Sequence, residues 1–189
     1  MKKYKWVLIG GAGAIGNNLI LNILNKENVD KILILDNLSS GSIKWLPKSD
    51  YIEFCYCDIY DFDKLSAKLR KFCPHYIFNL AAHFANQNSV EHPETDLRVN
   101  GTGTLKLLQF CKKYSVKKII YTSSSCVYGN KKKMKENDPL KPGTPYAITK
   151  LLGEFYVKFW SEYYNMNIVV VRLFNIYSSY RMISFKKLY

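Results

Sequence analysis

The chain has 189 residues, of which 48% are hydrophobic and 23% are charged, a balance typical of a globular protein and not of a disordered or collagen-like one. No stretch approaches the roughly 18 consecutive apolar residues that a membrane-spanning helix needs, so we expect no membrane partner. The length predicts one domain. Lysine and arginine number 28 against 15 acidic residues, which gives a net charge of +13.

This positive charge invites a nucleic-acid interpretation, but its distribution argues against one. Arginine, which reads phosphates and bases through its planar fork, occurs only at Arg70, Arg98, Arg172 and Arg181. The lysines are spread along every segment, and their one dense run, Lys131–Lys135, lies in an expected loop. The same positive charge would also attract a small anionic ligand. We therefore expect no nucleic-acid partner.

The cysteines favour a cytoplasmic location. They are five, an odd number, and the N-terminal segment reads as a strand and a glycine turn and not as a secretion signal. Cys55 and Cys57 alternate along one expected strand, which predicts that both pack on one face in the core. The histidines, His75, His83 and His92, show no metal-ligand spacing with them, so we predict no metal site.

Short apolar runs alternate with longer amphipathic patterns throughout the chain. This alternation predicts a doubly wound (Rossmann) α/β fold, in which helices cover both faces of a parallel sheet and ligands bind at the carboxyl ends of the strands. The expected strands are Lys5–Gly10, Lys31–Asp36, Tyr51–Cys57, His75–Leu80, Lys117–Ser123 and Asn167–Arg172. The expected helices are Ala14–Lys26, Asp61–Phe72, Glu94–Tyr114 and Pro145–Tyr164.

A glycine-rich turn follows the first expected strand and opens the first helix. Gly10, Gly13 and Gly16 have the spacing that lets a pyrophosphate approach a helix N-terminus without meeting a Cβ. Asp36 stands at the end of the second strand, where a carboxylate would bind the adenosine ribose and repel a 2′-phosphate. The alternative is that Asp36 only forms the turn before Asn37. We expect a dinucleotide site with NAD as cofactor.

Tyr146 and Lys150 lie four residues apart on the helix that is expected to open at Pro145, so they project from one face. A nearby ammonium would lower the pKa of a tyrosine from its usual value of about 10, which would make Tyr146 a general base. Chance alone produces such pairs in a chain this rich in tyrosine and lysine. The serines at 123–125 add support, because they end the fifth strand, although they would equally cap the next turn.

These residues together resemble the extended short-chain dehydrogenases/reductases, specifically the NAD-dependent epimerase/dehydratase family that acts on nucleotide sugars. The resemblance covers essentially the whole chain and depends on the order and spacing of its parts. They are Gly10–Gly16, Asp36–Gly41, Cys57–Ile59, Asn79–Ala82, Val99–Thr102, Ser123–Gly129 and Tyr146–Lys150.

The resemblance implies a role for each matched residue. The catalytic group would be Ser124, Tyr146 and Lys150. The cofactor would be held by Gly10, Gly13, Ala14, Ile15, Gly16, Asp36, Asn37, Asp58, Ile59, Leu80, Ala81, Ala82, Asn100, Tyr146 and Lys150. The sugar nucleotide would meet His83, Ser124 and Asn175, although a lone histidine such as His83 is more often structural or solvent-facing.

Within the family, the serine segment favours an epimerase. In the 4,6-dehydratases, Asp and Glu follow the catalytic threonine, whereas Ser125 and Cys126 stand here. The segment Asp36–Gly41 also resembles that of 4-epimerases and uronate decarboxylases. The implied reaction is 4-epimerisation of a nucleotide sugar of the UDP-glucose type, in which Tyr146 takes the 4-hydroxyl proton while hydride passes transiently from C4 to NAD.

Family members carry a further C-terminal lobe that forms most of the substrate pocket, and this chain stops shortly after its sixth strand. We therefore expect an NAD-binding domain over 1–177 and a divergent tail over 178–189, with the substrate lobe largely absent. A non-catalytic NAD-binding remnant or interaction module stays as the alternative function, followed by a decarboxylase or dehydratase. The resemblance also implies a homodimer that forms a four-helix interface through Glu94–Tyr114 and Pro145–Tyr164.

Overall fold

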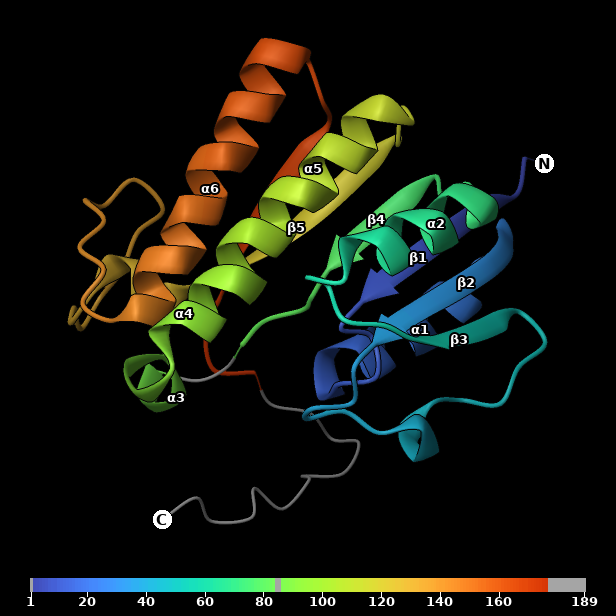
Figure 1. Cartoon of the computed structure of the whole chain (residues 1–189), viewed down its shortest axis with the longest axis horizontal. Helices are drawn as coiled ribbons and strands as arrows, with labels where there is room; N and C mark the ends of the chain where they lie inside the picture. Colours follow the sequence, from blue (N-terminus) through green and yellow to red (C-terminus); the bar gives the residue numbers. More distant parts are fainter. Residues whose placement is uncertain (1, 84–85, 177–189) are drawn as a thin grey trace.

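The computed structural model describes residues 2–83 and 86–176, which fold around one parallel sheet (Figure 1). The sheet has six strands in the order β3-β2-β1-β4-β5-β6, and every neighbouring pair is parallel. The strands are β1 (Tyr4–Ile9), β2 (Val29–Asp36), β3 (Ile52–Tyr56), β4 (Tyr76–Asn79), β5 (Lys118–Ser124) and β6 (Ile168–Leu173). The helices are α1 (Ala14–Leu24), α2 (Phe62–Phe72), α3 (Asn86–Glu91), α4 (Pro93–Asp96), α5 (Gly103–Lys113) and α6 (Pro145–Tyr164).

The predicted doubly wound α/β fold is confirmed, since helices lie on both faces of the sheet. On one face, Ile20 and Ile23 of α1 pack with Leu8, Ile32 and Ile34 of the first two strands. On the other face, α2, α5 and α6 cover a second apolar cluster. Strand order reverses between β1 and β4, the switch point at which such folds bind ligands beside the carboxyl ends of the strands.

The helical segment predicted at Glu94–Tyr114 is present, but it is not α-helical throughout. The helical segment begins at Pro93, passes through a π-helical turn, η2 (Leu97–Thr102), and continues as α5. A π-turn accommodates one extra residue and is frequent at functional sites, and this one contains the predicted site residue Asn100. Helix α3 was not predicted, because its six residues, NQNSVE, carry almost no apolar periodicity.

Local sequence explains the start of α6, the helix that carries Tyr146 and Lys150. The Thr144 hydroxyl accepts a hydrogen bond from the backbone N–H of Ala147, and Pro145 occupies the first turn, where its missing N–H costs nothing. The helix ends at Tyr164, followed by Asn165 with a left-handed backbone (φ 52°). The predicted start and end of this helix are confirmed.

Cys55 and Cys57 lie in the core, as their alternation along one strand predicted. Cys57 is buried and Cys55 is half-buried against the same apolar cluster. None of the helices in the described ranges is long and apolar enough to cross a membrane. The predicted tail, 178–189, lies outside the described residues.

Candidate cofactor and active site

The glycine turn between β1 and α1 is packed so closely that most of its glycines are required by the fold itself. Gly10 has a φ of +76°, and a Cβ there would lie 2.6 Å from the backbone nitrogen of Ala81. A Cβ on Gly16 would lie 2.3 Å from the carbonyl oxygen of Gly11. The turn is thereby pressed against the segment after β4, where Gly10 lies against the backbone of Leu80 and Ala81.

Gly13 is different, because the protein leaves room for a side chain there. Among the described residues, a Cβ on Gly13 would meet only the carbonyl oxygen of Gly10, at 3.7 Å, and its φ of −79° suits any residue. As the N-cap of α1, Gly13 offers no side-chain cap, and the helix has no acidic residue in its first turn. Ala14 and Ile15 are exposed in that turn. An uncapped helix N-terminus beside a bare backbone fits a pyrophosphate.

Asp36 fixes the glycine turn to the end of β2. Its carboxylate accepts hydrogen bonds from the backbone N–H of Ala12 at 2.9 Å and of Leu38 at 2.7 Å. The second bond stabilises Leu38 in a left-handed conformation (φ 58°), so the turn-forming role considered for Asp36 is present. Each carboxylate oxygen keeps a further lone pair, so a ribose hydroxyl can still bind.

Asn37 and Asp58, predicted at the adenine end of the cofactor, are brought together across the ends of β2 and β3. The Asn37 amide donates to the Asp58 carboxylate at 2.6 Å, and the other Asp58 oxygen accepts from the Tyr60 backbone at 3.3 Å. Ile59 is 3% exposed and packs where Gly103 of α5 leaves space. Its side chain therefore belongs to the core.

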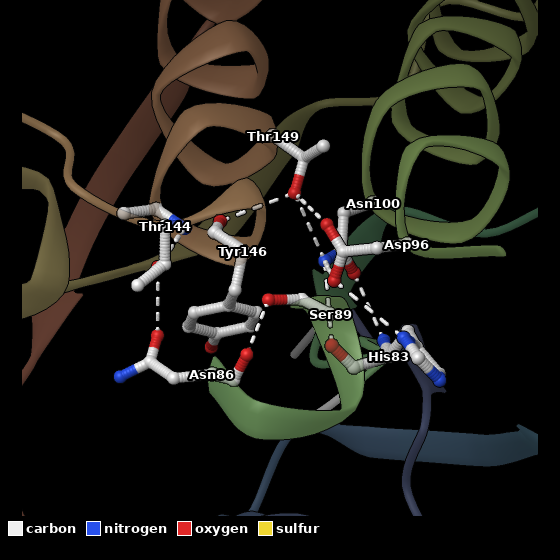
Figure 2. Close-up of polar contacts among 9 residues, drawn as sticks. His83, Asn86, Ser89, Asp96, Asn100, Thr144, Tyr146 and Thr149 are labelled. Atoms are coloured by element: carbon white, nitrogen blue, oxygen red, sulfur yellow. Dashed lines mark hydrogen bonds and ion pairs between the residues drawn. The ribbon is translucent and has the colours of Figure 1, made fainter. Parts of the chain in front are cut away.

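Ser124 and Tyr146 meet at the carboxyl end of β5. The Ser124 hydroxyl accepts from the backbone N–H of Cys126 at 3.2 Å, which is the capping role considered for these serines, and it also hydrogen-bonds the Tyr146 phenol. Tyr146 projects from the first turn of α6 toward the segment that carries Asn86 (Figure 2). A hydroxyl pair at this edge is suited to handle a proton of a substrate alcohol.

Lys150 lies one turn further along α6 and is 2% exposed. Its ammonium donates to the carbonyl oxygen of Thr122 at 3.0 Å and lies 5.8 Å from the centre of the Tyr146 ring. Burial lowers the pKa of Lys150 to about 8, while the negative charge of Asp96 acts in the opposite direction.

The expectation that Lys150 lowers the pKa of Tyr146 is wrong for the chain alone. Burial raises the pKa of Tyr146 to about 12, and the hydrogen bond with Ser124 opposes only part of that shift. The reason is desolvation, which disfavours the phenolate more than nearby hydrogen bonding favours it. Tyr146 is therefore a neutral phenol near pH 7.

A buried polar network behind Tyr146 ties the segment after β4 to α6 (Figure 2). The Asn100 side chain accepts from the His83 backbone N–H at 2.9 Å and donates to Asp96 at 3.0 Å and to Thr149 at 3.2 Å. Thr149 in turn donates to Asp96. Sequence analysis found Asn100 and His83 but missed Asp96 and Thr149. The sequence signal that could have identified Asp96 and Thr149 is a polar residue at a core-facing position of a helix.

A second buried network, also missed, fixes the end of β6. Glu154 of α6 accepts from the Ser123 hydroxyl and forms an ion pair with Arg172, whose Nη2 lies 2.7 Å from the carboxylate. Arg172 also donates to the Tyr128 hydroxyl at 2.7 Å. The hydrogen bond to Glu154 raises the pKa of Arg172. This network orients the strand end that leads to Asn175.

The remaining predicted residues are less constrained. Asn175 follows β6 at the carboxyl edge of the sheet and is exposed. The backbone of His83 is held by Asn100, and its Nδ1 lies 3.6 Å from a carboxylate oxygen of Asp96. Among the described residues, no group of three or more His, Cys, Asp or Glu side chains could hold a metal ion.

Comparison with known proteins places this geometry in a family. The sequence model of the "NAD dependent epimerase/dehydratase family" matches residues 6–187. The chain is 34% identical to the UDP-glucose 4-epimerase of Mycolicibacterium smegmatis over 177 residues, which is 90% of this chain and 56% of the relative. An epimerase structure from Methanothermobacter thermautotrophicus superposes with a TM-score of 0.86 at 42% identity, over 93% of this chain and 53% of that one. The UDP-glucose 4-epimerase of Thermus thermophilus, solved with NAD, gives 0.82 at 30% identity, over 89% and 54%.

The fold and the matched positions thus define a Rossmann-type protein of the class that acts with a dinucleotide. More narrowly, the chain belongs to the NAD-dependent epimerase/dehydratase family, which confirms the family resemblance. The chain spans about half the length of the curated relatives it matches.

Proposed function

We propose that this chain acts as an NAD-dependent nucleotide-sugar 4-epimerase. The observation that carries the proposal is the meeting of Ser124 and Tyr146 beside the buried Lys150, at the strand ends that also carry the open glycine turn. Relatives named UDP-glucose 4-epimerase and a structure of a UDP-N-acetylglucosamine 4-epimerase from Methanobrevibacter ruminantium, 34% identical, support this reaction class.

The residues present fit NAD. The room at Gly13 and the uncapped start of α1 suit the pyrophosphate, and Asp36 suits an adenosine ribose without a 2′-phosphate. Asn37 and Asp58 would border the adenine, while Leu80–Ala82 would lie along the cofactor, whose nicotinamide ribose Lys150 would hold. When bound, NAD would accept hydride from C4 of the sugar and return it to the opposite face.

The protein would supply proton transfer and orientation. Ser124 would hydrogen-bond the 4-hydroxyl of the sugar, and Tyr146 would take its proton as the carbonyl forms and give it back when the alcohol is restored. Because the pKa of Tyr146 is about 12 in the chain alone, it needs added positive charge nearby to act as a base near pH 7. Lys150 is already present in the chain alone, so the oxidised nicotinamide of bound NAD would have to supply the additional positive charge. His83 and Asn175 would contact the sugar nucleotide.

Turnover separates this function from that of a non-catalytic NAD-binding protein, and NAD binding tests the premise that both share. We would titrate the chain with NAD by calorimetry and assay conversion of UDP-galactose into UDP-glucose. Binding with turnover, abolished by Tyr146→Phe while NAD affinity is kept, is the expected result. Binding without turnover would assign this chain the non-catalytic alternative, and failure to bind NAD would overturn both.

We also propose that two copies associate through α6 and the adjoining η2. Four apolar side chains on one side of α6 are exposed, namely Ile148 (54%), Phe155 (62%), Phe159 (47%) and Tyr163 (72%). Leu97 of η2, 48% exposed, lies beside Leu152 of α6, because both would touch a Cβ on Gly101. An apolar surface of this length on paired helices favours a four-helix interface between copies.

A further inference from the structure

Asp96 is a fully buried carboxylate that the proposed proton transfer does not use. Its exposure is 0%, and a charge so buried is unfavourable unless other groups compensate it. One oxygen accepts from Asn100 at 3.0 Å, and the other accepts from the Thr149 hydroxyl. These bonds come from η2 and from α6, so Asp96 links two elements that pack against each other.

Several titratable groups face Asp96 from the surrounding elements. From the segment after β4, the buried Nδ1 atom of His83 lies 3.6 Å from it and has no hydrogen bond to a described residue. From α6, its field acts on Lys150 and Tyr146, and from β5 on Tyr121. It disfavours ionisation of both tyrosines and favours the charged form of Lys150. Asp96 thus favours the protonated forms of Lys150, Tyr146 and Tyr121.

Lys150 is the group most dependent on this charge. It is 2% exposed, and its one hydrogen bond in the described structure goes to the Thr122 carbonyl oxygen. A carbonyl dipole alone compensates a buried ammonium poorly. Lys150 also lies against the rings of Tyr121 and Tyr146, at 5.5 Å and 5.8 Å from their centres, and both are neutral near pH 7.

We propose that Asp96 is a positioning residue whose buried negative charge keeps Lys150 an ammonium and whose hydrogen bonds hold α6 against the segment that carries His83. The inference rests on the proposed function in one respect, because a charged Lys150 matters for catalysis only if this site transfers hydride. The electrostatic part concerns the chain itself and is testable without cofactor or substrate.

The test compares the proton affinity of Lys150 in the wild type, in Asp96→Asn and in Thr149→Val. Trace acetylation with acetic anhydride between about pH 6 and 11, followed by mass spectrometry of the peptide containing Lys150, gives the midpoint at which the amine becomes reactive. We expect the midpoint to fall by about one pH unit in Asp96→Asn, because an opposite charge is lost. Thr149→Val, which removes a hydrogen bond but not the charge, is the control and should leave the midpoint near that of the wild type. An unchanged midpoint in Asp96→Asn would overturn the proposal.

Asp96→Asn alone could fail to fold, and a double-mutant comparison covers that outcome. If Asp96 compensates Lys150, removing both charges in Asp96→Asn/Lys150→Met should restore part of the melting temperature lost in Asp96→Asn. If the double variant is no more stable than Asp96→Asn, then Asp96 has a structural role that is independent of Lys150, and the proposal is wrong.

Turnover separates this inference from the proposed function. In an active protein, Asp96→Asn should move the alkaline limb of the pH–rate profile to lower pH, since Lys150 loses its proton earlier. Absence of turnover in the wild type would refute the epimerase assignment for this chain. The acetylation midpoint and the melting temperatures would still decide the role of Asp96.

Discussion

The ammonium of Lys150 donates to the carbonyl oxygen of Thr122 at 3.0 Å, from a side chain that is 2% exposed. This bond holds the middle of β5 to the second turn of α6, and it places a charge in the interior beside two tyrosine rings. The same burial that orients the amine lowers its pKa to about 8. Burial thus both orients the Lys150 amine and reduces its affinity for a proton, which makes the stability of the protein depend on pH.

The stability of the wild type should rise relative to that of Lys150→Met as the pH increases from about 8 to 10.5. In this range the unfolded lysine, with a pKa of 10.5, still holds the proton that the folded lysine, with a pKa of about 8, has released. The unfolded state therefore binds more protons, and stability increases with pH. Denaturant unfolding of both proteins across this range measures the difference, which should change by about 3 kcal/mol. A difference that stays constant with pH would show that Lys150 is not desolvated as described.

Ser124 should matter for turnover far more than its neighbour Ser125. Ser124 hydrogen-bonds the Tyr146 phenol and lowers its pKa, whereas Ser125 lies beyond the end of β5. On the proposed function, Ser124→Ala should reduce kcat about 100-fold or more with little change in NAD affinity. Ser125→Ala is the matched control, one residue away and with the same change in side chain. Equal rates for the two variants would remove Ser124 from the proton-transfer group.

A larger side chain should abolish NAD binding at Gly13 but prevent folding at Gly16. Gly13→Val should fold, with a small loss of melting temperature from the poorer helix N-cap, and should lose NAD binding, because the new side chain occupies the space proposed for the pyrophosphate. Gly16→Val should fail to fold, since its Cβ would lie 2.3 Å from the Gly11 carbonyl oxygen. Circular dichroism and calorimetric titration with NAD separate the two effects. NAD affinity at the wild-type level in a folded Gly13→Val would place the cofactor elsewhere.

The features that sequence analysis predicted correctly depend on short-range spacing. The glycine turn, the four-residue separation of Tyr146 and Lys150, and the Thr144–Pro145 start of α6 are each set within a few residues. The parallel arrangement of the sheet also followed from the alternation of strands and helices. Such features need no knowledge of distant contacts.

The features that were missed depend on contacts between distant parts of the chain. Thr149 and Asp96 are 53 residues apart, and Ser123 and Glu154 are 31 apart. The π-turn at Leu97–Thr102 has no distinct composition. The pKa of Tyr146 was predicted in the wrong direction because the spacing revealed the nearby amine but not the depth of burial. Burial is a property of the assembled fold.

The exposed side of α6 leads to a last prediction, on association. Phe155 is 62% exposed at the middle of the apolar surface formed by Ile148, Phe159 and Tyr163. If this surface joins two copies, light scattering should give about twice the 22.0 kDa of one chain. Phe155→Glu should then weaken the dimer about tenfold or more, because it places a charge at the centre of the interface. Tyr51→Glu is the control, since Tyr51 is also exposed (47%) but precedes β3 at the opposite edge of the sheet. A monomeric wild type, or equal effects of both variants, would contradict an interface at α6.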